Sequence, residues 1–233
     1  MLIMVDGIDG SGKGTIIESW KKYLSDQGNA IFDLKKYIKD TGQFPELSEP
    51  SKYDFIFSAE PTFAGIGKVI RDELIKKGTN YPIRALAEAY SLDRLVLYTK
   101  MIIPLLRDNR VIIQDRGVSS SICYQSIDNA VPFEENAILS GNKLALEFRP
   151  DHLVIVNTDP LESVKRLQGR SGKNDNSFYE QLENLKKESG IFLSPEYQKF
   201  FADRGTVVHH LNGNEKIGIM NSEAITLLKQ LLT

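Results

Sequence analysis

A glycine-rich run with one lysine contains the residue types that could most directly do chemistry in this sequence. It follows an apolar stretch and reads Gly7-Ile8-Asp9-Gly10-Ser11-Gly12-Lys13-Gly14-Thr15. Glycines let the backbone turn tightly and point successive N–H groups at phosphate oxygens, and a helix that begins here adds its positive N-terminal end. Lys13 then places an ammonium on the terminal phosphates. The spacing predicts a P-loop for a nucleotide; the alternative is a glycine turn that merely joins a strand to a helix.

The residue after Lys13 is Gly14, where such loops usually carry a magnesium-binding Ser or Thr. Thr15 or a water molecule must then fill that role. The G-K-G-T variant resembles adenylate kinases, which favours the nucleoside monophosphate kinases over the GTPases. The base-reading motif N-K-x-D of GTPases is also incomplete, because Asn142-Lys143-Leu144-Ala145 lacks the aspartate.

These residues need a framework, and short apolar runs that alternate with segments of helical period predict an α/β fold with a mainly parallel sheet. The predicted strands are 2–5, 30–34, 55–58, 111–114, 153–157 and 207–211. The predicted helices are 14–26, 64–77, 82–108, 119–128, 133–147, 160–169, 178–189 and 215–231. The polar stretch 35–53 is expected to be a surface insertion without a core element. The whole chain, 1–233, is expected to form one domain.

Composition and charge narrow the class of protein. The 233 residues are 41% hydrophobic, and 29 basic against 31 acidic residues leave a formal charge of −2. This balance gives no general attraction for nucleic acid or for an anionic membrane, so a bound anion must be held locally. The single cysteine, Cys123, cannot form an internal disulfide, and no apolar segment reaches the roughly 20 residues of a membrane span. We expect a soluble, cytoplasmic protein with small-molecule nucleotide partners.

A second motif follows the predicted strand 111–114 and reads Asp115-Arg116-Gly117-Val118-Ser119-Ser120-Ser121-Ile122-Cys123-Tyr124-Gln125. An aspartate at the carboxyl end of a strand beside a P-loop can hold hydrated Mg²⁺, and an adjacent arginine can bind a phosphate through two nitrogens. The run resembles the D-R-Y-x-x-S-x-x-A-Y-Q signature of thymidylate kinases, with Gly117 in place of the tyrosine and Cys123 in place of the alanine. The alternative is an exposed ion pair at the end of a strand.

Two further segments keep the order of that family along the chain. Ser58-Ala59-Glu60-Pro61-Thr62, with Ile66-Gly67 and Ile70-Arg71 after it, resembles the family's R-E-P-G-G-T segment and the following helix; Tyr90-Ser91-Leu92-Asp93-Arg94 resembles F-A-x-D-R. The resemblance implies that Tyr90 stacks on a thymine base and that Arg94 reaches a base carbonyl. A spacing of four puts both on one face of a helix. The alternative is a core Tyr90 and a surface ion pair of Arg94 with Asp93 or Glu88.

A basic segment, 166–177, resembles the family's arginine-rich lid. It begins Arg166-Leu167-Gln168-Gly169-Arg170-Ser171-Gly172-Lys173-Asn174-Asp175, and Glu180 lies beyond it. Phosphoryl transfer spreads negative charge over the γ-phosphoryl oxygens, so cations that close over them lower the barrier. The interior of the P-loop, 8–11, has no arginine, so this role is expected of Arg166, Arg170 or Lys173. The alternative is a solvated basic loop.

The resemblance runs from residue 1 to about 201 and implies a three-layer P-loop kinase fold with a five-stranded parallel sheet, flanking helices and a mobile lid. It implies transfer of the ATP γ-phosphoryl group to a pyrimidine deoxynucleoside monophosphate, above all dTMP, with Mg²⁺ on Asp115 and Thr15, by a homodimer. The implied catalytic residues are Lys13, Arg116, Arg166 and Arg170. The implied acceptor-binding residues are Asp9, Glu60, Pro61, Arg71, Tyr90, Arg94, Arg116, Ser120, Ser121, Tyr124 and Gln125.

Three departures from the family pattern leave other functions open. Ala59 stands where the family often has a phosphate-binding arginine, Gly117 replaces an aromatic residue near the base, and 35–53 has no obvious counterpart. One alternative is a kinase of the same fold that acts on another nucleotide or on a nucleoside. The other is a nucleotide-binding regulator that has lost phosphoryl transfer.

Overall fold

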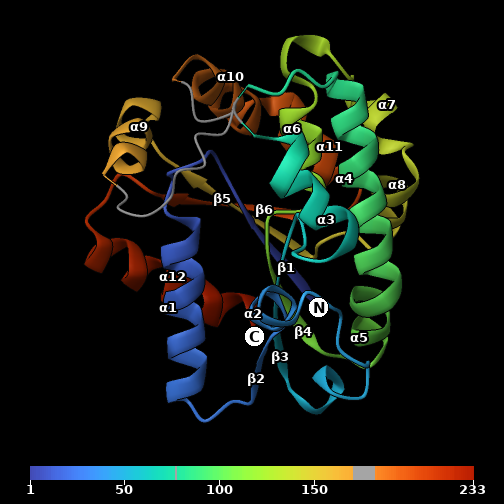
Figure 1. Cartoon of the computed structure of the whole chain (residues 1–233). Coiled ribbons are helices and arrows are strands. Elements are labelled where there is room, and N and C mark those ends of the chain that lie inside the picture. The colour runs from blue at the N-terminus through green and yellow to red at the C-terminus, as the bar shows by residue number, and fades with distance from the viewer. Residues whose placement is uncertain (77, 170–181) are drawn as a thin grey trace.

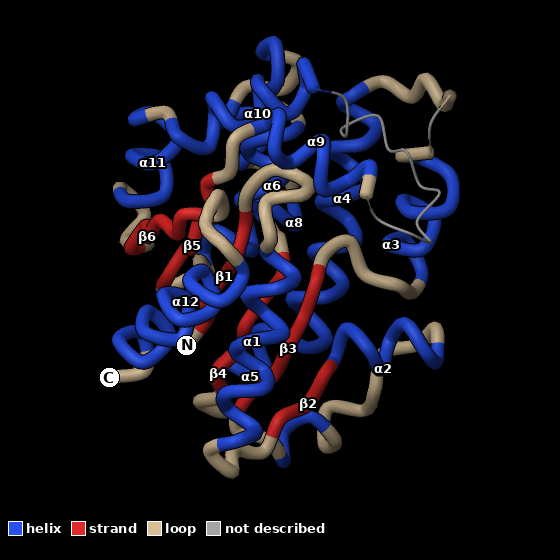
Figure 2. Tube along the Cα trace, turned by 90° about the vertical axis from the view of Figure 1, so that its left-hand side faces the viewer, coloured by secondary structure: helices blue, strands red, loops and turns tan. Residues whose placement is uncertain are grey.

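The apolar runs form the strands of one parallel sheet. The computed structural model describes residues 1–76, 78–169 and 182–233. The strands are β1 (Leu2–Asp6), β2 (Ile31–Asp33), β3 (Phe55–Ala59), β4 (Val111–Asp115), β5 (His152–Asn157) and β6 (Val207–Asn212). Within the described residues they form a 6-stranded sheet in the order β2-β3-β4-β1-β5-β6, with every neighbouring pair parallel (Figure 2). The α/β fold and the six predicted strands are confirmed, whereas the five-stranded sheet implied by the resemblance is one strand short.

The strand order reverses at β1, in the middle of the sheet. The chain leaves β1 for the outer strand β2, returns through β3 and β4 to one side of β1, and continues on the other side with β5 and β6. Open parallel sheets bind ligands outside the carboxyl ends of the strands at such a reversal. Val5 of β1 is the register partner of Asp115 of β4, so the P-loop and the Asp115 motif leave the sheet side by side.

Helices cover both faces of the sheet. They are α1 (Lys13–Asp26), α2 (Leu34–Thr41), α3 (Gly65–Val69), α4 (Ile83–Leu97), α5 (Ile103–Arg107), α6 (Val118–Tyr124), α7 (Phe133–Ala137), α8 (Ser140–Glu147), α9 (Pro160–Gln168), α10 (Leu182–Leu193), α11 (Pro195–Ala202) and α12 (Ile217–Leu231). Helices α1 and α12 lie on one side of the sheet, and α4, α5 and α8 on the other (Figure 1). Along β1, Ile3 and Val5 pack with the first group, and Leu2 and Met4 with the second. None of the described helices is both long and apolar enough to cross a membrane.

Two long predicted helices are interrupted. The segment 82–108 forms α4 and α5 with a turn of π-helix, Tyr98–Ile102, between them. The segment 133–147 divides into α7 and α8, because Leu139 between them is non-helical (φ −58°, ψ 138°). The prediction also lacks α11, although Ser194 starts it by accepting a hydrogen bond from the Tyr197 N–H at 3.1 Å. A serine followed by proline is a recognisable start signal for a helix.

The segment 35–53 is not merely a surface insertion, and this part of the prediction is wrong. Its first residues belong to α2, whose Leu34 and Ile38 are buried in the core. A spacing of four puts these two side chains on one face of the helix. Asp33 starts α2 by accepting a hydrogen bond from the Lys36 N–H at 2.8 Å. The apolar stripe is only two residues long among polar neighbours, which is why the sequence pattern hides it.

Candidate active site

The loop between β1 and α1 has the strand–loop–helix setting that a P-loop needs. Gly7 and Gly10 have φ angles of 140° and 81°, which residues with side chains rarely adopt. A Cβ on Gly7 would lie 2.6 Å from the carbonyl oxygen of Val156, so this glycine also permits the close approach of β5. The Thr158 hydroxyl, just after β5, donates to the Ser11 carbonyl at 3.0 Å. The neighbouring strand therefore holds the loop from the side.

Lys13 points back into this loop. Its ammonium donates to the carbonyl oxygens of Gly7 at 2.8 Å and Ile8 at 2.7 Å, and the residue is 6% exposed. Burial, with Arg116 acting in the same direction, lowers the pKa of the Lys13 ammonium to about 8. A phosphate group in the loop would supply the full negative charge that two carbonyl dipoles do not. The position is compatible with the predicted phosphate role of Lys13, which stays a prediction.

Arg116 connects the P-loop with α6. Its guanidinium forms an ion pair with Asp9 of the loop, donates to the Tyr124 hydroxyl at 2.8 Å and lies 3.6 Å from Asp6. Burial acts against the charged form, but Asp9, Tyr124 and Asp6 together raise the pKa of Arg116 well above its ordinary value. Arg116 and Asp9, which are both predicted to bind the acceptor, are therefore in direct contact.

Asp6, at the end of β1, is a site residue that the sequence reasoning missed. It is fully buried and accepts hydrogen bonds from the Gly7 N–H at 2.8 Å and from the hydroxyls of Ser119 and Ser120, the latter at 2.8 Å. Asp6 thus joins the start of the P-loop to the start of α6. The signal in the sequence is a carboxylate directly before the first glycine, at the end of an otherwise apolar strand.

Ser121, Tyr124 and Gln125 are the remaining predicted acceptor residues of the Asp115 motif, and all three are buried. The Ser121 hydroxyl accepts from the Arg94 guanidinium at 3.1 Å, and the Tyr124 hydroxyl donates to the Gly7 carbonyl at 3.2 Å. Gln125 is 2% exposed, and its side-chain oxygen has no hydrogen-bond partner within the described part of the chain. Tyr124 thus contacts the P-loop and Ser121 contacts Arg94; contact of these side chains with an acceptor stays a prediction.

Asp115, the predicted magnesium ligand, forms an ion pair that the sequence reasoning did not anticipate. The Lys35 Nζ lies 2.8 Å from Asp115 Oδ2. Burial raises the pKa of Asp115, but Lys35 and Arg116 outweigh this effect and hold that pKa below its ordinary value. Thr15, the other predicted ligand, is half-buried in the first turn of α1. No cluster of three or more His, Cys, Asp or Glu suited to a metal occurs among the described residues.

Two of the departures from the family pattern lie beside this carboxylate. Ala59, the last residue of β3, is the register partner of Asp115. A Cβ on Gly117 would lie 2.4 Å from the Met4 Cε, so the Met4 side chain occupies the space in which a larger residue at 117 would begin. The space near Asp115 is therefore shaped by residues outside the two phosphate motifs.

Arg94, the predicted base reader, is buried in a polar cluster. Its guanidinium lies 2.6 Å from Glu60 Oε2 and donates to Asn142, and the residue is 1% exposed. The alternative of a surface ion pair with Asp93 or Glu88 is wrong, because Arg94 is buried and pairs with Glu60. Asp93 instead accepts hydrogen bonds from the Thr62 N–H and hydroxyl, each at 2.7 Å. In this structure Arg94 positions the segment that follows β3.

Tyr90 and Arg71 lie near each other and within electrostatic range of Arg116 in the second phosphate motif. Tyr90 is half-buried, and burial raises the pKa of its phenol to about 12, although Arg116 and Arg71 act in the opposite direction. Arg71 donates to the Pro61 and Thr62 carbonyls and stacks on a ring, its guanidinium carbon lying 3.9 Å from the centroid of Phe63. The structure thus brings Tyr90, Arg71 and Pro61 to the β3 side of the site.

Of the predicted lid, 166–177, the structure describes residues 166–169, which include Arg166. Arg166 contacts Glu162 Oε1 at 3.2 Å and donates to the Gly213 carbonyl at 2.8 Å. Arg170, Lys173 and Glu180 lie outside the described residues.

Glu188 of α10 is another group that the sequence reasoning missed. It is fully buried, and neither carboxyl oxygen has a hydrogen-bond partner within the described residues. Burial raises its pKa well above the ordinary value, and Asp9 acts in the same direction. A glutamate on a helix with alternating charges gives no sequence signal of this burial.

The comparisons with known proteins agree with this geometry. The family model described as thymidylate kinase matches residues 44–204. A probable thymidylate kinase of Pyrobaculum calidifontis is 30% identical over 194 residues, which cover 83% of this chain and 81% of the relative. The thymidylate kinase of Mycoplasma mobile is 30% identical over 246 aligned positions, which cover 100% of this chain and 96% of the relative.

Proposed function

The chain belongs to the thymidylate kinase family, and from this we propose that it transfers the γ-phosphoryl group of ATP to dTMP. A phosphate oxygen of dTMP attacks the γ-phosphorus, the bond from that phosphorus to the β–γ bridging oxygen breaks, and the products are dTDP and ADP. No general base is needed, because the attacking oxygen already belongs to an ionised phosphate. The protein then has to position two nucleotides and neutralise charge.

One observation supports this proposal independently of the relatives: two phosphate motifs leave adjacent strands and contact each other. Val5 and Asp115 are register partners, and beyond them Arg116 pairs with Asp9 inside the P-loop. An anion held by the P-loop would therefore lie beside a second cation that belongs to another strand. Transfer from one phosphate to another requires two such binding groups side by side, one for the donor phosphates and one for the acceptor phosphate.

We assign the two nucleotides to opposite sides of this contact. The loop N–H groups and Lys13 would bind the donor phosphates of ATP. Arg116 and Arg71, on the β4 and β3 side, would bind the acceptor phosphate, with Asp9 at the acceptor sugar hydroxyl. Tyr90, which is half-buried near Arg71, would present an aromatic face to the base.

The residues present fit a magnesium ion held mainly by the nucleotide. Mg²⁺ takes oxygen ligands and commonly uses one or two carboxylates together with phosphates and water. Asp115 supplies an ionised carboxylate at the end of β4, and Thr15 supplies a hydroxyl or leaves its place to water. When bound, the ion would neutralise charge on the transferring phosphates. The homodimer and the catalytic role of Arg166 and Arg170 remain predictions from the resemblance.

The test is a coupled assay of the purified protein with ATP and Mg²⁺ against a panel of deoxynucleoside and nucleoside monophosphates and free nucleosides. We expect ADP formation with dTMP at the highest kcat/KM. Turnover with another acceptor alone would indicate a kinase of the same fold with other specificity. ATP binding without turnover on any acceptor would indicate a regulator.

A further inference from the structure

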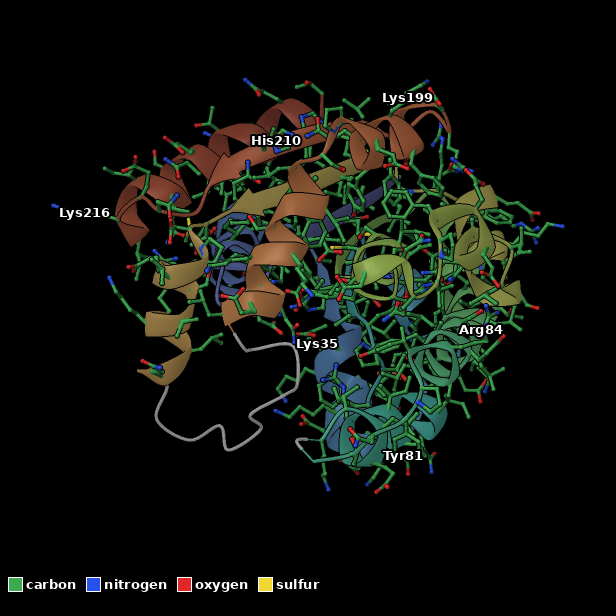
Figure 3. The ribbon with its side chains drawn as sticks, turned by 90° about the horizontal axis from the view of Figure 1, so that it is seen from above. Lys35, Tyr81, Arg84, Lys199, His210 and Lys216 are labelled. Atoms are coloured by element: carbon green, nitrogen blue, oxygen red, sulfur yellow. The ribbon has the colours of Figure 1, made fainter. Side chains whose placement is uncertain are left out.

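Lys35 brings an ammonium to the carboxyl edge of the sheet from outside the phosphate motifs. It is the second residue of α2, is separated from Asp115 by 80 positions, and lies 2.8 Å from its carboxylate. Its side chain is 37% exposed, so it remains open to solvent and to a ligand. Seen from above, Lys35 lies near the middle of the molecule, whereas Lys199, Lys216, Tyr81 and Arg84 lie towards the periphery (Figure 3).

A small neighbour leaves room for this ammonium. Ala59 is the register partner of Asp115, and side chains of paired residues lie on the same face of a sheet. A long side chain at 59 would compete with Lys35 for the carboxylate, but alanine cannot reach it. The cation at this position therefore comes from α2 instead of from β3.

A second contact of α2 shows which side of the site this helix covers. Lys39 follows Lys35 by four residues and so shares its face. The Lys39 Nζ lies 5.9 Å from the centroid of the Phe63 ring, and the guanidinium of Arg71 lies against the same ring. Phe63 and Arg71 belong to the segment after β3, on the acceptor side. The face of α2 that carries Lys35 therefore covers the acceptor side.

Several cationic side chains lie around the Asp115 carboxylate. Lys35, Arg116 and Lys13 all act on the Asp115 carboxylate, and Asp115 acts on Arg71. Arg116 also pairs with Asp9 and lies 3.6 Å from Asp6, whereas Lys35 pairs with Asp115 itself. The half-exposed Lys35 ammonium has three donors, and a phosphate monoester with up to two negative charges offers it several acceptor oxygens.

We propose that Lys35 binds the phosphate group of the acceptor nucleotide and that the ion pair with Asp115 holds its ammonium ready for this contact. The inference rests on the proposed function and adds a residue of α2 to it. It also gives the segment 35–53 a role in the site.

The test compares the binding of dTMP with that of thymidine, which lacks the phosphate, by titration calorimetry. Lys35→Met keeps most of the side-chain length and removes the charge. We expect dTMP affinity to fall by about 10- to 100-fold, as for the loss of one charge-assisted contact, and thymidine affinity to stay within about threefold. Lys35→Arg should retain most of the preference for dTMP. Lys36→Met is the matched control, because Lys36 is exposed and pairs with Asp40 instead.

Several results would overturn the proposal. An equal loss for dTMP and thymidine in Lys35→Met would mean that Lys35 only holds α2 in place, and unchanged binding of both would mean that it has no role. Far-ultraviolet circular dichroism checks the fold, and Lys35→Gln replaces the methionine variant if that variant is unfolded.

The failure of the proposed function has a different signature. If the wild type does not prefer dTMP to thymidine, the same comparison is made with other pairs of monophosphate and nucleoside. A pair whose preference depends on Lys35 would support the phosphate contact with another acceptor base. If the wild type prefers no monophosphate, the role of Lys35 is wrong together with the function.

Discussion

The guanidinium of Arg94 and the carboxylate of Glu60 form an ion pair of 2.6 Å whose side chains are 1% and 2% exposed. The pair joins α4 to the segment after β3, and Gln114 of β4 also donates to Glu60 at 2.8 Å. Burial raises the pKa of Glu60 to about 7, although Arg94 acts in the opposite direction. The pair thus connects the part of the site that is assigned to the acceptor with the core of the sheet.

We expect that removing Arg94 lowers the stability of the folded protein, and that this is the main effect of the substitution. Arg94→Ala leaves Glu60 buried without its counter-ion, which typically costs about 3–5 kcal/mol in the free energy of unfolding. Urea unfolding measures this loss. The control is Arg84→Ala, whose exposed pair with Glu135 should contribute less than about 1 kcal/mol. Equal effects of the two variants, together with a raised KM for dTMP only in Arg94→Ala, would instead favour direct contact of Arg94 with the base.

Replacing Lys13 should slow phosphoryl transfer strongly. Lys13→Met keeps the stem of this buried side chain but removes the charge that is assigned to the donor phosphates, so kcat should fall by about 10²-fold or more. Steady-state kinetics and a thermal melt measure activity and fold separately. Lys22→Met, on the exposed side of the same helix, should leave both unchanged. Turnover near that of the wild type in Lys13→Met would contradict the P-loop assignment.

Replacing Tyr90 should affect the acceptor more than the donor. If its ring stacks on the base, a contact worth about 1–3 kcal/mol, Tyr90→Ala should raise the KM for dTMP by about 5- to 100-fold with little change for ATP. Tyr90→Phe keeps the ring and should behave like the wild type. A comparable rise in the KM of both substrates, or an unfolded alanine variant, would show that Tyr90 is a core residue.

Glu188 should make the free energy of unfolding fall as the pH rises. Its pKa is raised in the folded state, so the unfolded chain ionises first, near pH 4.3 for an ordinary glutamate, and stability is lost from about there upward. Glu188→Gln removes this loss, and its stability relative to the wild type should increase between about pH 4 and 8 in urea unfolding. Glu183→Gln is the control on the same helix, because Lys186 lowers the pKa of Glu183 and the sign reverses. A difference between Glu188→Gln and the wild type that does not vary with pH would show that the buried carboxyl is ionised.

The sequence by itself determined the features of this protein that depend on residues close together along the chain. The P-loop is contiguous, and its glycines are needed for backbone angles within that loop, as the φ angles of Gly7 and Gly10 show. The inner strands β1, β3, β4 and β5 are buried along most of their length and read as short apolar runs, so the parallel α/β fold was predictable. The carboxyl ends of parallel strands meet at one edge, so the proximity of Asp9 and Arg116 followed from their places after β1 and β4.

Only the tertiary structure decided the partners of the charged side chains. Lys35 and Asp115 are 80 positions apart, and Arg94 finds Glu60 in place of the neighbouring Asp93. Burial of Asp6 and Glu188 depends likewise on segments that are distant in sequence. The physical reason is that a charge pair or a desolvated carboxyl depends on the distance between side chains, which the packing of the helices on the sheet sets, and on the water that this packing excludes.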